Sequence, residues 1–194
     1  ACYSWVAYQT AYLKAHYPAE YMSAVLSNNM NNMDEIAKFM DDIKKHDIKI
    51  LGPDVNESFT QFTVNKQGNV RFGMAGIKGI GENAVNSVIQ EREANGIYKD
   101  VFDFIERVNL TTVNKKGIES LVGSGAFDCF QEVNRGTFAV DLGKGETFAD
   151  ILLRYGNKFQ KNSSDASTSL FGGDAAVQTA RPMLPITPEL NQLE

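Results

Sequence analysis

Cysteine and histidine are scarce in this sequence, which has 194 residues but only two of each. Cys2 and Cys129 are too few for a disulfide framework, and no CxxC pair is present. This usage predicts a reduced, cytoplasmic compartment. His16 and His46 are likewise too few for a histidine-rich metal site, so we expect neither a bound metal nor a cofactor.

Long apolar stretches and enzymatic motifs are missing as well. No run of about 18 apolar residues occurs, so no membrane-spanning helix is expected. The sequence contains no HExxH, GxSxG or Walker loop and no convincing pair of general acid and base, so no catalytic residue is predicted. Neither an initiator methionine nor a signal peptide opens the chain, and we expect a fragment of a longer protein.

The overall composition is typical of a globular protein. Its apolar fraction is 43% and its charged fraction 22%, and the length fits one domain or two small ones. The net charge is −5, but residues 66–118 carry +2 between segments of −3 and −4. If the chain binds nucleic acid, we expect contact in this basic middle part and weak affinity, because the acidic flanks repel phosphate.

Hydrophobic spacing predicts a mostly α-helical fold with a small β-hairpin. Alternating residues at 59–64 and 70–72 flank a turn and predict the hairpin, and residues 48–51 predict another short strand. Helices are expected at 4–17, 18–29, 33–46, 81–95, 100–108 and 114–122, with weaker signals at 134–142 and 148–159. We expect four regions: 1–50 helical, 51–130 hairpin and motif, 131–160 weakly helical, and 161–194 linker and tail.

The stretch from Gly76 to Val85 has the order of glycines and apolar residues that is typical of a helix-hairpin-helix. Without a Cβ, the backbone of Gly79 and Gly81 can approach a phosphate closely. A helix beginning near Gly81 would direct its free N–H groups and positive dipole end at the anion. Such a site holds the DNA backbone without reading its sequence. The predicted DNA-binding residues are Lys78, Gly79, Ile80, Gly81 and Asn83.

Two other interpretations of this stretch are open. A plain turn before a helix is one, because a GxG string alone is common. A dinucleotide-binding GxGxxG loop with Ala84 in the third glycine position is the other. It fits less well, because the preceding segment is too short and glycine-rich for a buried parallel strand and no βαβ unit follows.

Lys115 and Lys116 form a second candidate for contact with DNA. They follow Asn114, a good helix cap, and so fall in a first helical turn, where the helix dipole disfavours cations. That placement favours a partner anion, while solvated surface lysines are the alternative.

Several strings, taken in order, form a specific pattern: YQTAYLKAHYPAEY at 8–21, LGPDVNES at 51–58, VRFG at 70–73 leading into IKGIG at 77–81, FDF at 102–104 and GAFD at 125–128. Over about residues 1–140, the chain resembles the alpha subunit of the bacterial replicative DNA polymerase III, a C-family polymerase. Gly136, Gly143 and Gly145 interrupt the stretch where that family has a helix beginning with an Asn-Arg pair.

The resemblance implies that residues 1–50 end the fingers domain and that residues 51–130 hold a helix-hairpin-helix module that grips duplex DNA behind the active site. In that family, DNA-directed nucleotidyl transfer uses Mg²⁺ and aspartates of a palm domain that this sequence does not contain. The implied role is a non-catalytic, DNA-holding part of a replicative polymerase in the cytoplasm. Its implied partners are duplex DNA, the rest of the polymerase chain, the sliding clamp and other replisome subunits.

The tail carries a second hypothesis. STSLFG at 167–172 resembles the short peptide by which this family docks on the ring-shaped sliding clamp. Leu170 and Phe171 would fill an apolar pocket of the clamp, or else they pack back on their own domain. In this alternative the chain is a protein-interaction segment and the hairpin is only structural. An unrelated helix-hairpin-helix repair module would leave residues 8–21 unexplained.

Overall fold

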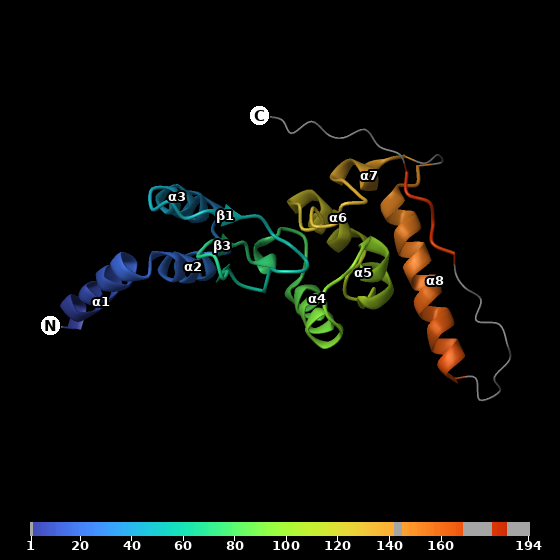
Figure 1. Ribbon diagram of the computed structural model, residues 1–194, viewed down its shortest axis with the longest axis horizontal. Helices are drawn as coiled ribbons and strands as arrows, with labels where there is room; N and C mark the ends of the chain where they lie inside the picture. Colours follow the sequence, from blue (N-terminus) through green and yellow to red (C-terminus); the bar gives the residue numbers. More distant parts are fainter. Residues whose placement is uncertain (1, 142–144, 169–179, 186–194) are drawn as a thin grey trace. The chain divides into compact units, whose positions relative to one another are not determined.

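The computed structural model describes residues 2–141, 145–168 and 180–185 (Figure 1). It divides the chain into two compact units, Ala1–Lys78 and Gly79–Glu194. The boundary falls inside the predicted helix-hairpin-helix stretch, residues 76–85. The described chain is mostly helical with a small sheet, which confirms the predicted fold class.

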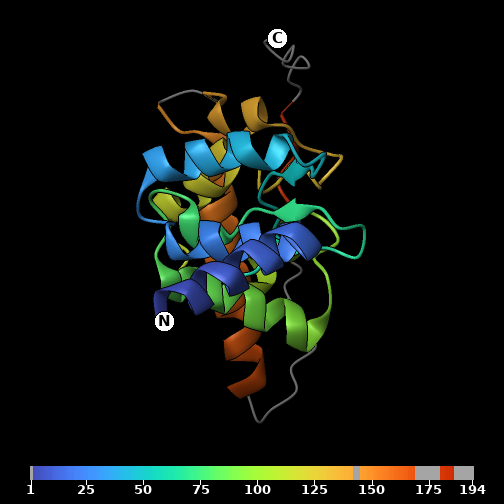
Figure 2. The same cartoon turned by 90° about the vertical axis from the view of Figure 1, so that its left-hand side faces the viewer.

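The first unit combines three helices with short strands. Its elements are α1 (Cys2–His16), α2 (Pro18–Asn28), α3 (Met33–Lys44), β1 (Ile50–Leu51), β2 (Thr63–Val64), β3 (Val70–Arg71) and the 3₁₀ turn η1 (Met74–Gly76). Helix α2 opens on a proline, whose missing N–H is harmless at a first helical position. The Asn32 side chain caps α3 by accepting a hydrogen bond from the Glu35 amide. Figures 1 and 2 both show α3 beside α2.

The sheet has the strand order β1-β3-β2. Strands β2 and β3 are antiparallel, with Val64 opposite Val70, so the predicted hairpin is confirmed. Strand β1 pairs with β3 in parallel, with Ile50 opposite Val70. This pairing joins segments that are distant in the chain, and short-range alternation does not reveal it.

One apolar core lies between α2, α3 and the sheet. Its buried members are Ala19, Met22, Leu26, Ile36, Ile43, Phe62 and Val70. The Ser23 hydroxyl donates to the Phe62 carbonyl at 2.8 Å, which ties α2 to the chain just before β2. Burial of this cluster, more than the length of the strands, holds the small sheet in place.

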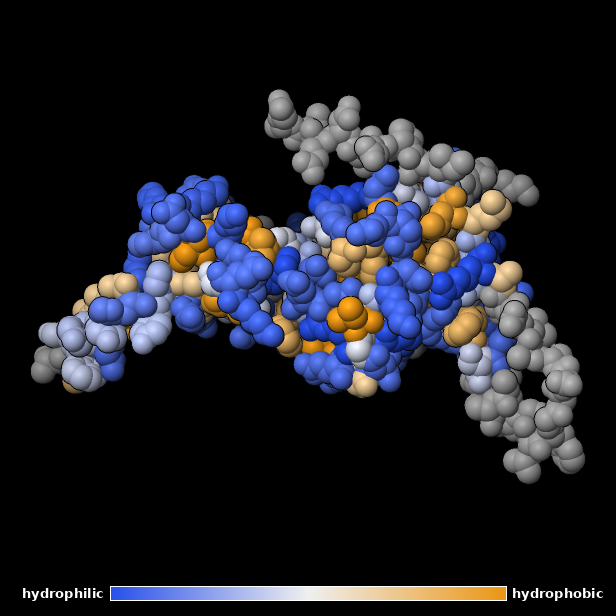
Figure 3. Space-filling model, in the orientation of Figure 1, coloured by the Kyte–Doolittle hydropathy of each residue, from blue (hydrophilic) through white to orange (hydrophobic). Residues whose placement is uncertain are grey.

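Helix α1 differs from its neighbours because none of its described residues is buried. Tyr3 is 92% exposed, and Trp5 and Tyr8 are each 62% exposed. The rings of Trp5 and Tyr8 stack along the helix with centroids 6.2 Å apart. The α1 surface is pale in Figure 3, since tyrosine and tryptophan lie near the middle of the hydropathy scale.

The second unit is built from helices around an aromatic core. Its elements are α4 (Glu82–Asn95), α5 (Val101–Arg107), α6 (Lys115–Ser124), α7 (Arg135–Ala139) and α8 (Phe148–Thr168). Phe127 is buried at the centre, with ring centroids 4.9 Å from Phe104 and 5.6 Å from both Phe130 and Phe138. Helix α8 contacts α5, α6 and α7 and completes this core.

The last two helices depart from their predicted bounds: α7 is shorter than the predicted 134–142, and α8 is longer than the predicted 148–159. Asn134 and Thr137 form a capping box that starts α7 in spite of Gly136. Phe148 and Leu152 are fully buried on the inner face of α8. Helix α8 continues to Thr168, past residue 161, from which a linker is predicted. The helix therefore runs into a stretch rich in serine and asparagine.

Candidate nucleic-acid interface

Gly79 has a conformation that other residues adopt only with strain. Its φ is +99°, in the range that favours glycine. A Cβ added there would lie 2.5 Å from the Ser120 hydroxyl oxygen and 3.6 Å from Cε of Lys116. The backbone at Gly79 is therefore pressed against α6. Ile80 is buried next to it, and a Cβ on Gly117 would meet the Ile80 side chain at 4.0 Å.

The start of α4, at Gly81, is exposed to solvent. Gly81 has an extended φ of −83°, and an added Cβ would meet no atom within 4 Å. The Gly81 carbonyl accepts from the amides of Ala84 and Val85, which begins the helix. Among the described residues, no side chain makes a capping hydrogen bond at this helix end. The first-turn N–H groups of α4, which cannot bond within the helix, thus lie beside a residue without a side chain.

Lys116 and Ser120 of α6 lie beside this turn. They are four residues apart, so they share one face of α6, and that face lies next to Gly79. Lys116 is exposed, and it forms no ion pair with any described residue. Lys116, one of the predicted DNA-contacting residues, thus lies next to the glycine turn. Ser120 was not singled out by any sequence motif, because only its packing against Gly79 marks it.

Lys115 is engaged elsewhere. Its ammonium lies 2.6 Å from an Asp150 carboxylate oxygen and 3.9 Å from one of Glu119. The Asp150 carboxylate accepts hydrogen bonds from Lys115 and from the backbone and side chain of Thr147. These bonds lower the pKa of Asp150 to about 2. The pair ties the first turn of α6 to that of α8. The positive charge of Lys115 is therefore compensated within the unit.

The other predicted contacts are exposed. Lys78 is the residue before Gly79 in the chain, and Asn83 lies in the first turn of α4. Glu82 is also exposed in that turn. Its carboxylate interacts favourably with the helix dipole, but it places a negative charge at the helix end that would face an anion.

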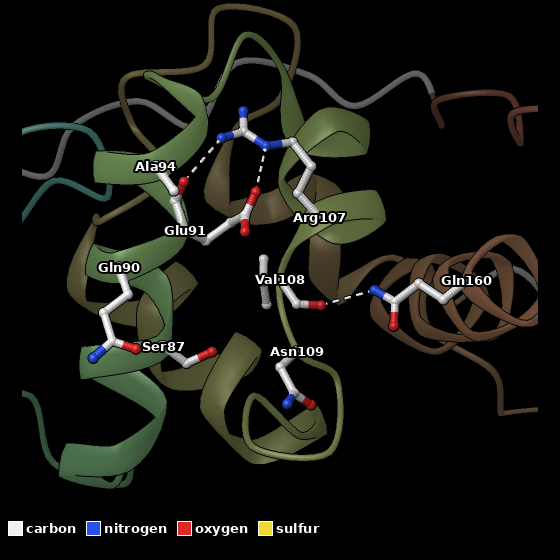
Figure 4. Close-up of a pocket in the computed structure, with 8 residues that line it drawn as sticks. All are labelled: Ser87, Gln90, Glu91, Ala94, Arg107, Val108, Asn109 and Gln160. Atoms are coloured by element: carbon white, nitrogen blue, oxygen red, sulfur yellow. Dashed lines mark hydrogen bonds and ion pairs between the residues drawn. The ribbon is translucent and has the colours of Figure 1, made fainter. Parts of the chain in front are cut away.

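A groove of about 610 Å³ lies between α4, the end of α5 and α8 (Figure 4). Its two charged groups pair with each other, Nε of Arg107 lying 3.1 Å from a Glu91 carboxylate oxygen. The Gln160 amide donates to the Val108 carbonyl at 2.7 Å. These polar groups hold the helices together, so the charged groups of the groove are used by the fold itself.

Within 2–141, 145–168 and 180–185, no three His, Cys, Asp or Glu side chains gather closely enough to hold a metal ion. In that same part of the chain, no helix is both long and apolar enough to cross a membrane. The predicted clamp-docking residues Leu170 and Phe171 lie outside the described residues.

Comparison with known proteins supports the motif assignment. A family model described as "Helix-hairpin-helix motif" matches residues 47–138. The chain is also 37% identical over 172 residues to DNA polymerase III subunit alpha of Haemophilus influenzae, and 41% identical over 172 residues to that of Borreliella burgdorferi. Each alignment covers 89% of the chain. The chain matches a fragment of DNA polymerase III subunit alpha.

The match to DNA polymerase III subunit alpha covers a small share of these relatives. The chain spans 14% of the Haemophilus and Borreliella proteins. The Pasteurella multocida subunit, 44% identical over 128 residues, is spanned over 11% of its length. The predicted helix-hairpin-helix and the predicted family are both confirmed.

Proposed function

We propose that this chain is a non-catalytic part of a replicative DNA polymerase and that it holds duplex DNA by its phosphate backbone, independently of sequence. The single observation that carries the proposal is the open start of α4 at Gly81, where no side-chain hydrogen bond caps the helix, next to the positive-φ turn at Gly79. A helix N-terminus with exposed amides is a ready-made site for a phosphate. The family match supports this role in DNA replication.

Charge supports the same location but limits the affinity. Lys116 adjoins the turn, and Lys78 precedes it in the chain, whereas Lys115 is held by Asp150. Glu82 opposes an anion at the same helix end. With few uncompensated cations and a net charge of −5, we expect the isolated chain to bind duplex weakly and to release it as salt rises.

Substitution of Gly81 by aspartate separates a binding role from a structural one. The added side chain meets no atom within 4 Å, and aspartate is a preferred helix cap. Gly81→Asp should therefore fold as well as the wild type, or be a few tenths of a kcal/mol more stable. It should weaken duplex binding by about tenfold or more, because a phosphate then meets a carboxylate in place of free amides.

Asn157→Asp provides the matched control, since it adds the same charge at an exposed position of α8. Fluorescence anisotropy with a labelled duplex gives the affinities, and urea unfolding gives the stabilities. The control should lower the affinity much less than Gly81→Asp. Equal affinities of Gly81→Asp and the wild type would show that phosphate does not bind at this helix end.

The non-catalytic part of the proposal has its own test. A primed template, deoxynucleotides and Mg²⁺ are supplied to the chain, and primer extension is measured. We expect no extension, because the family's chemistry belongs to a palm domain that the sequence does not contain. Extension above that of a mock preparation would contradict this part of the proposal, and it would leave the Gly81 result unaffected.

A further inference from the structure

Arg181, in the segment of residues 180–185, contacts three residues at and within helix α5. Its guanidinium grips Glu106 with two nitrogens: Nε lies 3.1 Å from one carboxylate oxygen and Nη2 3.3 Å from the other. The third nitrogen, Nη1, donates to Asp100 at 3.0 Å. The guanidinium carbon also lies 5.3 Å from the centre of the Phe102 ring. These four contacts join segments that are 75 to 81 residues apart in the chain.

The groups around Arg181 are held in position by other parts of the unit. Asp100 caps α5 with its other oxygen, which accepts from the Asp103 amide at 2.6 Å. Glu106 accepts a hydrogen bond from the Tyr155 hydroxyl of α8, and the Tyr155 ring packs edge-on against Phe102. Each of the two carboxylates is thus held by a second partner besides Arg181.

Burial makes the site selective for a cation. The Glu106 side chain is only 14% exposed, so its charge is largely removed from water. A carboxylate in that position is costly unless a cation compensates it. Two acids in a fixed arrangement and an adjacent aromatic face suit the planar, five-donor guanidinium better than the compact ammonium of lysine.

We propose that Asp100, Phe102, Glu106 and Tyr155 form a receptor for an arginine side chain, and that its occupant is Arg181 of the same chain. The receptor fastens the segment of residues 180–185 to α5. This role is independent of phosphate binding at α4.

A paramagnetic label at position 183 tests the docking. Met183 is 92% exposed, so Met183→Cys can carry a nitroxide in a chain whose two exposed cysteines are replaced by serine. With Arg181 present, the label should strongly reduce the NMR intensities of the α5 amides. Arg181→Ala should restore them, and Arg181→Lys should restore them in part. Unchanged positions of the other amide signals show that the fold persists.

Two further variants are measured with the same label, one as a control and one that changes the receptor. Arg154→Ala removes another arginine that pairs with a glutamate by two nitrogens, and it should leave the α5 broadening intact. Glu106→Gln changes the receptor side and should release the segment much as Arg181→Ala does. The proposal is overturned if α5 is not broadened in the labelled parent, or if the broadening survives both Arg181→Ala and Glu106→Gln.

Discussion

Replacement of Gly79 by alanine should destabilise the second unit chiefly through the backbone. A non-glycine residue at a φ of +99° costs about 1–3 kcal/mol. The new Cβ would also lie 2.5 Å from the Ser120 hydroxyl oxygen, but 3.6 Å from the Ser120 Cβ. Rotation of the hydroxyl away from the methyl group relieves that contact for about 0.5–1.5 kcal/mol. The expected total is therefore about 1.5–4.5 kcal/mol, most of it conformational.

Urea unfolding followed by NMR signals of α4 and α6 measures this effect within the unit concerned. Ser120→Ala in the Gly79→Ala background should recover only the contact share, about 1 kcal/mol. Gly123→Ala is the matched control, because this exposed helical glycine has no atom within 4 Å of an added Cβ. It should stabilise the unit by about 0.5–1 kcal/mol. The reasoning is refuted if Gly79→Ala leaves the stability of the unit unchanged or raises it, or if Ser120→Ala restores full stability.

Three further predictions concern stability, affinity and the tail. The buried Tyr98 hydroxyl donates to the Val88 carbonyl at 2.8 Å, so Tyr98→Phe should cost about 1 kcal/mol at neutral pH. Burial raises the pKa of Tyr98, so above about pH 10 the unfolded chain loses this proton while the folded chain keeps it, and the stability falls as the pH rises. Urea titrations should accordingly fall less steeply with alkaline pH for Tyr98→Phe than for the wild type. Glu82→Gln should tighten duplex binding severalfold in anisotropy titrations and cost about 0.3–1 kcal/mol of stability; unchanged affinity would place the phosphate elsewhere. A sliding-clamp pull-down with Leu170→Ala and Phe171→Ala should lose the clamp if the tail docks there, and equal retention would reject that docking.

The local elements follow closely from the sequence. The helices of the first unit and helices α4 to α6 begin and end near their predicted residues, and the β2–β3 hairpin forms where it is predicted, although β2 begins at Thr63 and not at residue 59. Their signals are short-range: apolar spacing, a proline at the start of α2, and the caps Asn114 and Asp100. Such signals need no knowledge of the partner that an element packs against.

The arrangement of the site depends on contacts that short-range patterns do not contain. Nothing near Lys115 in the sequence indicates that Asp150 will neutralise it, and nothing near Ser120 indicates that it will adjoin Gly79. The pairing of β1 with β3 and the return of Arg181 to α5 are of the same kind. The glycine motif in the sequence therefore predicts the position of a phosphate site. Which lysines near that site are already paired with a carboxylate is known only from the fold.

The salt dependence of duplex binding tests the central claim most directly. A labelled duplex of about 20 base pairs is titrated with the wild-type chain at about 50 and 200 mM salt, together with a second duplex of unrelated sequence. We predict weak binding that falls steeply with salt and is equal for both sequences, since a helix end and a few lysines contact only phosphates. Binding that is independent of salt, or that prefers one sequence, would contradict the account, as would no binding at low salt.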